Sequence, residues 1–136
     1  MNDCIFCKLA NGEIPTNTVF EDENFRVILD AAPANLGHCL VLPKSHAKDI
    51  FEMPQELTEK AFGVAKKIAE AIKKSGLAEN VNILQNNGEL AGQTVSHFHV
   101  HVIPRLENDD VVIKSKTVDV DDEKTTNVVK SIKSAL

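Results

Sequence analysis

The chain has 136 residues, 43% of them hydrophobic, which suits one compact domain with a single core. Its formal net charge of −5 disfavours non-specific binding to nucleic acid or anionic membranes, because both depend on broad basic surfaces. The start of the chain, MNDCIFC, lacks the pattern of a signal peptide, and no apolar run approaches the roughly 20 residues of a membrane span. We therefore expect a cytoplasmic protein without nucleic-acid or membrane partners.

The first part of the chain predicts a short helix followed by three strands. Residues 3–10 suit a helix, and Thr18–Phe20 and Phe25–Leu29 suit two strands around an acidic turn. A loop that contains Pro and Gly then leads into His38–Leu42, a β-type run that a proline closes.

The second part predicts a long helix, two more strands and a terminal helix. Apolar residues recur every three or four positions over 55–75, as in an amphipathic helix: Leu57, Ala61, Ala65, Ile68 and Ile72. Val81–Leu84 and Val95–Ile103 suit a fourth and a fifth strand, and Glu107–Asp110 suits a solvated loop. A last helix is expected to begin with Asp121 as its cap. We expect it to bury four apolar residues: Val128, Val129, Ile132 and Leu136.

The order of these elements indicates the fold class. Short turns join most strands, and one helix separates two groups of them, which favours α+β over a doubly wound parallel sheet. We expect an antiparallel sheet of about five strands with one long helix, a short N-terminal helix and a C-terminal helix. Residues 1–136 would form a single domain, with 105–136 as a C-terminal extension. The apolar stripe of the long helix needs a partner surface, which the sheet of the same chain or a second subunit could supply.

The most informative stretch is His97-Phe98-His99-Val100-His101-Val102-Ile103. Because side chains alternate between the faces of a strand, the three histidines share one face and the apolar residues take the other. A row of histidines is a poor way to build a core, so chemistry or metal binding is indicated. One ion held by all three would be strained, because the Cα atoms of His97 and His101 would lie roughly 13 Å apart. Two neighbours could share an ion, and a chance polar face is the plain alternative.

This pattern resembles the motif of the histidine-triad (HIT) family. Other short motifs stand in the matching order: Asp30 after an apolar strand, Pro43-Lys44-Ser45-His46, Asn86-Asn87-Gly88 and Gly92-Gln93-Thr94. The resemblance covers roughly residues 4–105 and implies a HIT-like fold. The residues after 105 lie outside these motifs.

The resemblance implies a hydrolase that binds a nucleoside monophosphate unit and breaks the bond from its α-phosphorus to a leaving group. His99, the middle histidine, corresponds to the nucleophile that forms a nucleotidyl-histidine intermediate, and neutral imidazole suits that role near neutral pH. A backbone carbonyl is expected to hold its other ring nitrogen. His101 corresponds to the histidine that lies against the phosphate and helps the leaving group depart.

Further residues match positions that bind the nucleotide in the family. Gln93 and Thr94 match phosphate-side donors, together with backbone N–H groups around Gly92. Asn86 matches an asparagine near the phosphate and leaving group, and Asp30 a carboxylate that pairs with the ribose hydroxyls. The walls of the base pocket correspond to Ile5, Phe6, Ile14 and Leu29. Without the resemblance, these are an ordinary polar loop, a turn aspartate and core residues.

Two features of the sequence indicate which branch of the family the chain resembles, and hence which reaction it catalyses. Related nucleotidylyltransferases have glutamine where His101 stands, which favours a hydrolase over a transferase. The I-F-C-K-L and G-E-I-P stretches resemble the phosphoramidase branch, which usually acts as a homodimer, with the 55–75 helix at the interface by analogy. We expect a purine nucleoside 5′-phosphoramidate as substrate. The alternatives are a dinucleoside polyphosphate hydrolase, a nucleotide-binding regulatory protein and a metal protein whose site is the triad itself.

The pair Cys4 and Cys7 has four interpretations. A structural disulfide is improbable in a reducing compartment, and a thioredoxin-like redox pair would need a nearby βαβ unit that the sequence does not predict. With two triad histidines occupied by chemistry, His46 and His97 complete the four ligands of a structural zinc. Some bacterial members of the family carry zinc on this ligand set. Two buried cysteines and two hydrogen-bonded histidines are the alternative.

Three nearby features receive no catalytic role. Cys39 is expected in the core, and His38 is expected to be a solvated loop residue. Arg105 is followed at once by the acidic stretch Glu107–Asp110, and no basic cluster lies near the triad in sequence. This charge pattern disfavours a long polyphosphate leaving group.

Overall fold

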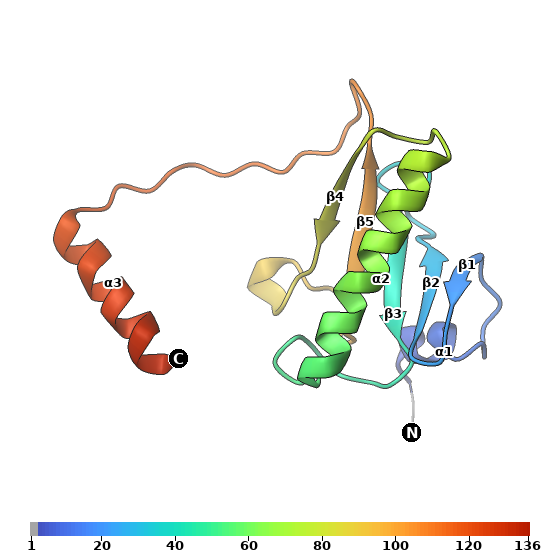
Figure 1. Ribbon diagram of the computed structural model, residues 1–136, viewed down its shortest axis with the longest axis horizontal. Coiled ribbons are helices and arrows are strands. Elements are labelled where there is room, and N and C mark those ends of the chain that lie inside the picture. The colour runs from blue at the N-terminus through green and yellow to red at the C-terminus, as the bar shows by residue number, and fades with distance from the viewer. Residues whose placement is uncertain (1–2) are drawn as a thin grey trace.

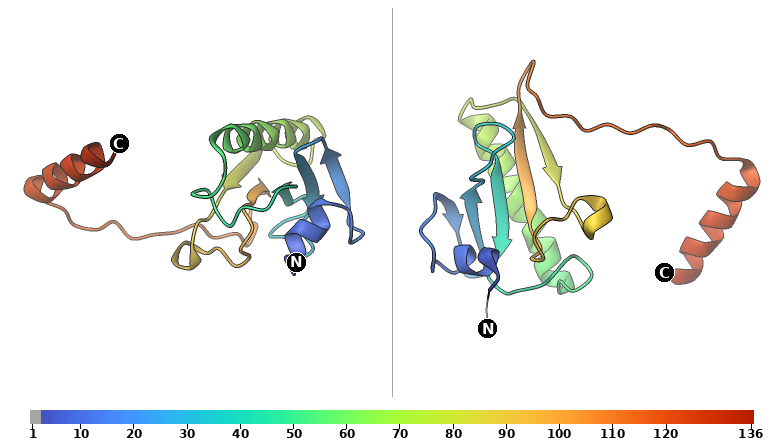
Figure 2. Two further views of the ribbon diagram at one scale, coloured as in Figure 1. Left: turned by 90° about the horizontal axis from the view of Figure 1, so that it is seen from below. Right: turned by 180° about the vertical axis from the view of Figure 1, so that it is seen from behind.

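A computed structural model describes residues 3–136 and contains one antiparallel sheet. Its five strands are β1 (Thr18–Glu21), β2 (Phe25–Leu29), β3 (Cys39–Pro43), β4 (Asn80–Leu84) and β5 (Val100–Arg105), in the spatial order β1-β2-β3-β5-β4. The long helix α2 (Gln55–Lys74) covers one face, and the short helix α1 (Ile5–Ala10) lies on the other (Figures 1 and 2). The predicted α+β fold is confirmed.

Two apolar clusters hold these layers together. In the larger one, the apolar stripe of α2 packs against the sheet: Ala61, Val64, Ala65, Ile68 and Ile72 meet Phe25, Val27, Val41, Phe98, Val100 and Val102. In the smaller one, Ala10 of α1 joins Ile28, Leu40 and Leu42 on the opposite face. The central strand β3 is therefore buried on both faces, and Cys39 is a core residue as predicted. The sheet of the same chain is the surface that α2 covers.

The register of the central strands gathers polar residues at one end of the sheet. Leu29 at the end of β2 pairs with Cys39, and Leu40 pairs with His101 of β5. The backbone N–H of Asp30 donates to the carbonyl of His38 over 2.8 Å, which extends the ladder by one residue. The end of β2, the start of β3 and the histidine segment therefore meet at one place.

The fifth strand differs from the expected span. It runs from Val100 to Arg105, so the predicted boundaries 95–103 are wrong at both ends. The segment before it bonds elsewhere, because the backbone N–H of Phe98 donates to the carbonyl of Ala47 over 2.7 Å instead of to a neighbouring strand. Phe98 is nevertheless fully buried in the core. The alternation of side chains thus begins before the strand does.

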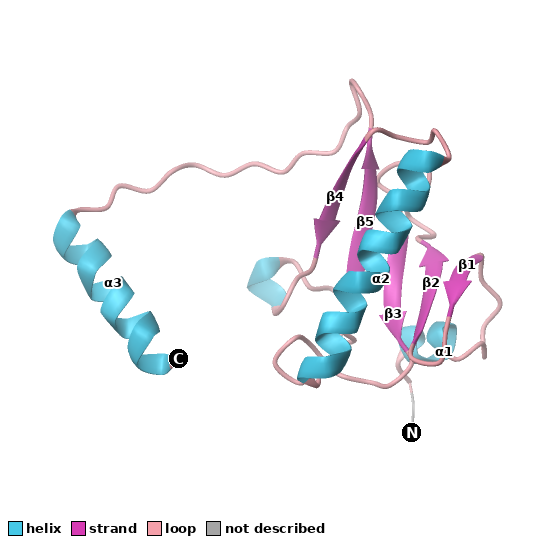
Figure 3. Ribbon diagram, viewed as in Figure 1, coloured by secondary structure: helices cyan, strands magenta, loops and turns pink. Residues whose placement is uncertain are grey.

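Helix α3 (Asp122–Ala135) stands apart from the sheet at the end of a long extended segment, as Figure 3 also shows. Asp121 caps it as predicted, accepting from the N–H of Lys124 over 2.8 Å. The predicted burial of its apolar residues is wrong, because all four are exposed: Val128 56%, Val129 45%, Ile132 58% and Leu136 99%. None of the helices within residues 3–136 combines the length and apolar character needed to cross a membrane.

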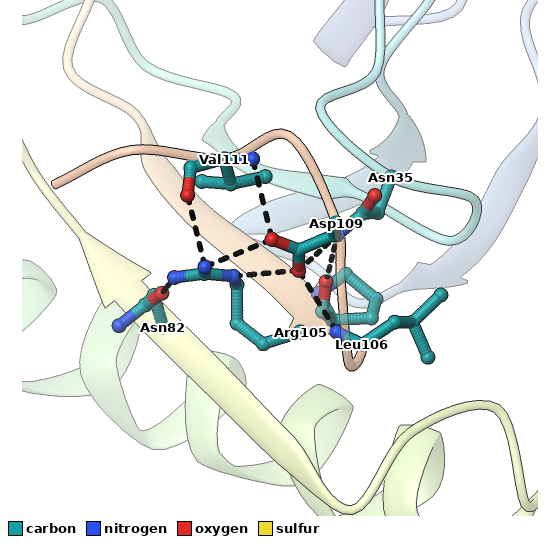
Figure 4. Close-up of polar contacts among 7 residues, drawn as sticks. Asn35, Asn82, Arg105, Leu106, Asp109 and Val111 are labelled. Atoms are coloured by element: carbon teal, nitrogen blue, oxygen red, sulfur yellow. Dashed lines mark hydrogen bonds and ion pairs between the residues drawn. The ribbon is translucent and has the colours of Figure 1, made fainter.

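A compact ion-pair network precedes this segment. Arg105 donates to both carboxylate oxygens of Asp109, at 2.9 and 3.0 Å (Figure 4). The side chain of Asp109 is only 5% exposed. The prediction of a solvated loop over Glu107–Asp110 is therefore wrong for Asp109, because Arg105 draws its carboxylate inward.

Candidate functional site

His99 lies immediately before β5 and is 6% exposed. Its Nδ1 lies 2.7 Å from the carbonyl of His97. A carbonyl only accepts, so Nδ1 carries the proton and the lone pair is on Nε2. Burial is the main cause that lowers the pKa of His99 below its usual value, against the opposing effects of the His97 carbonyl and Asp30. His99 is therefore held as a neutral imidazole with one basic nitrogen.

A second group of residues fixes the tautomer of His101. The backbone N–H of Ala34 donates to His38 Nδ1 over 3.0 Å, so the proton of His38 is on Nε2. That nitrogen lies 2.9 Å from His101 Nδ1 and 3.5 Å from a carboxylate oxygen of Asp30. His101 Nδ1 thus accepts, which leaves Nε2–H of His101 as a donor. The rings of His99 and His101 are neighbours, with centroids 4.9 Å apart.

His38 is the residue that the sequence analysis placed wrongly. It is 5% exposed rather than solvated, because it immediately precedes β3 and lies between Asp30 and His101. Its position one residue before a fully buried strand was the available signal. The pKa of His101 falls to about 4, mainly through burial and further through the neighbouring charges of His99 and His38. Both histidines of the pair are therefore neutral near pH 7.

A cavity of about 470 Å³ opens over these histidines. Its polar lining comprises Thr16, Asp30, Thr94, His99 and His101, and its apolar lining includes Phe6 and Leu29. The structure does not place Ile5 or Ile14 in this lining. Other apolar residues take those places: Leu9, Pro15, Ile28 and Leu40. The cavity thus combines apolar walls with two imidazoles and a carboxylate.

A glycine-containing loop borders the same histidines. Gln93 accepts from the N–H of Gly88 over 2.8 Å and donates to the carbonyls of Lys48 and Val95, at 2.6 and 3.0 Å. Both amide hydrogens of Gln93 are thus engaged, so this side chain shapes the loop. Gly92 has a φ of +94°, a conformation that L side chains rarely adopt.

Beyond the loop lies a second cavity, of about 540 Å³. It is lined by Lys48, Gly88, Glu89, Gly92, Gln93, Thr94 and Ser96. Thr94 lines both cavities and so marks their boundary. Asn86 lies beside Gly92, with its amide nitrogen 3.5 Å from the position a Cβ would take there.

Four residues from distant parts of the chain form a Cys/His cluster. The Nδ1 atom of His97 lies 3.4 Å from both Cys4 Sγ and Cys7 Sγ and 3.2 Å from His46 Nδ1. The Sγ atom of Cys7 is 3.3 Å from His46 Nδ1. His97 Nε2 donates to the carbonyl of Pro43 over 3.0 Å, so its Nδ1 presents a lone pair to the cluster. The four side chains could hold a metal ion, since their ligand atoms all lie within 4.8 Å of one another.

A second group within the same distance comprises Asp30, His38 and His101. Its geometry is already explained by hydrogen bonds that run from Ala34 through His38 to His101. We therefore describe it as a proton-ordering network. The Cys/His cluster differs, because two sulfur atoms and two imidazole nitrogens converge there.

Comparison with known protein families gives one match. The model of the HIT domain matches residues 11–108. An uncharacterised HIT-like protein of Methanocaldococcus jannaschii is 48% identical over 134 residues, which make up 96% of this chain and 98% of the archaeal one. The adenosine 5′-monophosphoramidase of Saccharomyces cerevisiae is 38% identical over 104 residues, 76% of this chain and 63% of the yeast protein.

Solved structures agree in fold. A crystal structure from Streptococcus mutans superposes with a TM-score of 0.93 at 40% identity, covering 99% of this chain and 86% of the streptococcal one. A zinc-bound histidine triad family protein from Mycobacterium smegmatis superposes with a TM-score of 0.77 at 37% identity, covering 98% of each chain.

Proposed function

The chain belongs to the HIT domain family, and we propose that it is a nucleotide hydrolase that cleaves purine nucleoside 5′-phosphoramidates at the α-phosphorus. One observation carries the proposal. A neutral imidazole with its lone pair on Nε2, His99, lines a nucleotide-sized cavity beside a second imidazole, His101, whose Nε2–H is a donor. A nucleophile and an adjacent donor are the two groups that displacement at phosphorus needs.

In the proposed reaction, the base lies against Phe6 and Leu29, and the carboxylate of Asp30 accepts from the ribose hydroxyls. Thr94 and backbone N–H groups around Gly92 donate to the phosphoryl oxygens. His99 Nε2 attacks the α-phosphorus, the bond from phosphorus to the amide nitrogen breaks, and the amine leaves after taking a proton from solvent. His101 Nε2–H donates a hydrogen bond that stabilises the negative charge that develops on the phosphoryl or leaving group. Water then cleaves the bond between phosphorus and His99, releasing the nucleoside monophosphate.

The charges around the site support a small leaving group. Arg105 is paired with Asp109 and does not line either cavity. Lys48 is the one basic residue among those that line the two cavities, and Glu89 lines the same cavity as Lys48. A polyphosphate brings charges that need more cationic partners than this. The yeast relative is named for an adenosine monophosphoramidase activity, which agrees with the proposal.

Two measurements on the whole protein test the proposed function. Mass spectrometry after rapid quenching with adenosine 5′-phosphoramidate should find a nucleotidyl adduct on the peptide that contains His99. Steady-state kinetics should give a higher kcat/KM for the phosphoramidate than for diadenosine tetraphosphate. An adduct on another residue would refute the nucleophile, and the reverse order of kcat/KM would refute the substrate class.

We also propose that Cys4, Cys7, His46 and His97 hold a structural zinc ion. Tetrahedral zinc with bonds of about 2.0 Å to nitrogen and about 2.3 Å to sulfur separates two nitrogens by about 3.3 Å and nitrogen from sulfur by about 3.5 Å. The observed nitrogen–nitrogen distance of 3.2 Å and nitrogen–sulfur distances of 3.3 and 3.4 Å fit those values. The carbonyl of Pro43 supplies the outer contact that orients a ligating histidine. The ion would supply no step of the reaction and would join α1 to the catalytic segment.

The active form is proposed to be a homodimer. Phe62 on α2 and Ile83 on β4 are 40% and 44% exposed, and β4 is an edge strand. Edge strands present unpaired backbone groups that another chain can use. Sedimentation at micromolar concentration should give twice the mass of the chain, and a monomer would refute this part of the proposal.

A further inference from the structure

The C-terminal arm, residues 111–136, is the part of the chain that the proposed activity does not use. It runs extended to residue 120 and ends in α3. In all the views of Figures 1 and 2, α3 stands clear of the sheet and of α2, and no residue of α3 is buried. Among residues 3–136, the arm therefore leaves its apolar side chains without a packing surface.

The composition of the C-terminal arm is unlike that of a solvated tail. Four β-branched residues of its extended part are 61–77% exposed: Val112, Ile113, Val118 and Val120. On α3, Val128, Val129, Ile132 and Leu136 recur every one to four positions and form one apolar stripe. A helix of this length is marginal in water, and most helices gain their stability by packing such a stripe. The arm therefore needs a partner surface.

The base of the C-terminal arm is fixed to the edge of the sheet (Figure 4). Beyond its pairing with Asp109, Arg105 donates to Asn82 Oδ1 over 2.7 Å and to the carbonyl of Val111 over 3.0 Å. The amide of Asn35 donates to Asp109 over 2.9 Å. Arg105 holds the pKa of Asp109 well below its usual range, so the network is charged at neutral pH. The network thus joins the first residue of the arm to β5 and β4. From there the arm leaves the domain on the side of β4.

A solved relative places the C-terminal arm in the same position. The arm makes up 26 of the 136 residues, so a perfect superposition of the other 110 residues alone would score at most about 0.81 (110/136). The Streptococcus mutans crystal structure reaches a TM-score of 0.93 over 99% of this chain. Its arm must therefore also lie away from its own domain. A segment that keeps this position in a crystal is held there by something other than its own domain.

We propose that the two subunits of a homodimer exchange their C-terminal arms, so that each α3 packs on the other copy of the chain. The inference rests on the homodimer of the proposed function. In a two-fold dimer, both subunits make the same contacts. If the arm of one subunit leaves on the β4 side and reaches the partner, the arm of the partner reaches the β4 side of the first subunit. This side carries a groove of about 290 Å³ between α2 and β4, lined by Lys66, Ala69, Glu70, Lys73, Glu79, Val81 and Ile83.

Charge complementarity supports a second copy as the occupant. The arm carries an acidic block at the start of α3: Asp119, Asp121, Asp122 and Glu123. On α2, Lys66 and Lys73 line the groove, with Glu70 beside them. Opposite charges on the arm and on α2 would steer the arm of one subunit toward the helix of the other.

The first test compares two double variants by sedimentation equilibrium. Val128→Glu with Ile132→Glu charges the apolar stripe of α3, whereas Asn127→Glu with Ser134→Glu adds the same charge to the opposite face. The stripe variant should dimerise at least tenfold more weakly than wild type, and the control should match wild type. A stripe variant that dimerises like wild type would refute arm exchange while leaving the homodimer and the hydrolase intact. A monomeric wild type would refute both the homodimer and the exchange.

The second test separates a partner's surface from the protein's own. Amide hydrogen exchange in residues 122–135 is measured on the wild-type protein above and below its dimer dissociation constant. Packing on a second copy predicts slow exchange at high concentration and fast exchange after dilution. Slow exchange at both concentrations would assign α3 to its own domain, and fast exchange at both would show that α3 packs nowhere. Either result overturns the proposal.

Discussion

Two histidine clusters lie within a few residues of each other and differ in what surrounds the rings. His97 is fully buried, with two cysteines and a second imidazole, that of His46, around its Nδ1. His101 is half-buried, borders a cavity and has His38 and a carboxylate on its inner side. Sulfur ligands suit a metal, whereas a carboxylate and an open side suit proton and phosphate chemistry.

The groups around each histidine therefore determine its role. The backbone joins the two clusters, because the carbonyl of His97 orders the ring of His99. His97 thus belongs to the Cys/His cluster through its side chain and to the catalytic histidines through its main chain. Variants that act on one cluster at a time measure how far the two are independent.

The largest expected effect is a loss of turnover that leaves the Cys/His cluster unchanged. Replacing His99 with Ala should lower kcat by about 10⁴-fold or more, because the covalent nucleophile is lost. Metal content and the dissociation constant for adenosine monophosphate should stay near wild type. Zinc analysis, isothermal titration and turnover of a phosphoramidate measure these three quantities. More than a few per cent of residual kcat would contradict the role of His99.

Removing His38 tests the ordering of His101. His38→Ala should lower kcat by about 10²-fold with little change in KM, because the ring of His101 loses the donor that fixes its tautomer. The pH dependence of kcat should also change shape, an effect that loss of packing alone would not produce. His38→Asn, whose amide can also donate, should recover part of the activity. An unchanged pH profile in His38→Ala would assign His38 to packing.

The joint variant Cys4→Ser with Cys7→Ser acts on the Cys/His cluster. It should lose about one zinc ion per chain and at least about 10 °C in Tm, because the ion joins α1 to the rest of the domain. Activity should fall less than in the histidine variants, since His99 keeps its carbonyl partner. Cys39→Ala is the matched control, because Cys39 is buried in the core outside the cluster. Protein purified without chelators and found free of metal would refute the zinc proposal.

The smallest effect concerns pH and stability. The pKa of His101 is about 4 in the folded protein and near 6.5 in the unfolded chain, so between these values the unfolded chain binds more protons. Stability is therefore greatest above pH 6.5 and falls as the pH decreases toward 4. The unfolding free energy of His101→Gln is measured by denaturant titration between pH 5 and 7. Its slope against pH should be smaller than that of the wild type, by the equivalent of up to about one bound proton. Equal slopes would contradict the lowered pKa.

Residue patterns predicted the parts of the fold that local physics determines. The stripe from Ala61 to Ile72 required a helix with one buried face, and the alternation around Val100 required a core face and a polar face. Side-chain alternation was predicted correctly even where the strand was not, because Phe98 lies in the core with Val100, whereas His97 and His99 contact Phe6 of α1. The pairing of Phe98 with Ala47 depends on residues far away in sequence, which no local pattern encodes.

The site residues that belong to a sequence motif could be predicted. Those that reach the site only through the tertiary structure could not. His99 and Asp30 stand in recognisable positions, and the structure lines one cavity with both. His38 and Leu9 are brought in by the register of β3 and by the packing of α1, so their roles depend on tertiary structure. The exposure of Val128 has the same origin, because an amphipathic pattern predicts a contact without saying which chain supplies it.

The span of the Cys/His cluster has a consequence for synthesis on the ribosome. Cys4 and His97 are 93 positions apart, so the cluster cannot close until most of the domain has been made. During that time, the contacts of the finished fold do not yet hold α1 and the thiols of Cys4 and Cys7. Chains grow from the N-terminus at about 5–20 residues per second, so this delay lasts on the order of 5–20 s. Cys4 and Cys7 leave the ribosome long before His97 and are fixed only after it, so their thiols are most open to oxidation while the chain is being made.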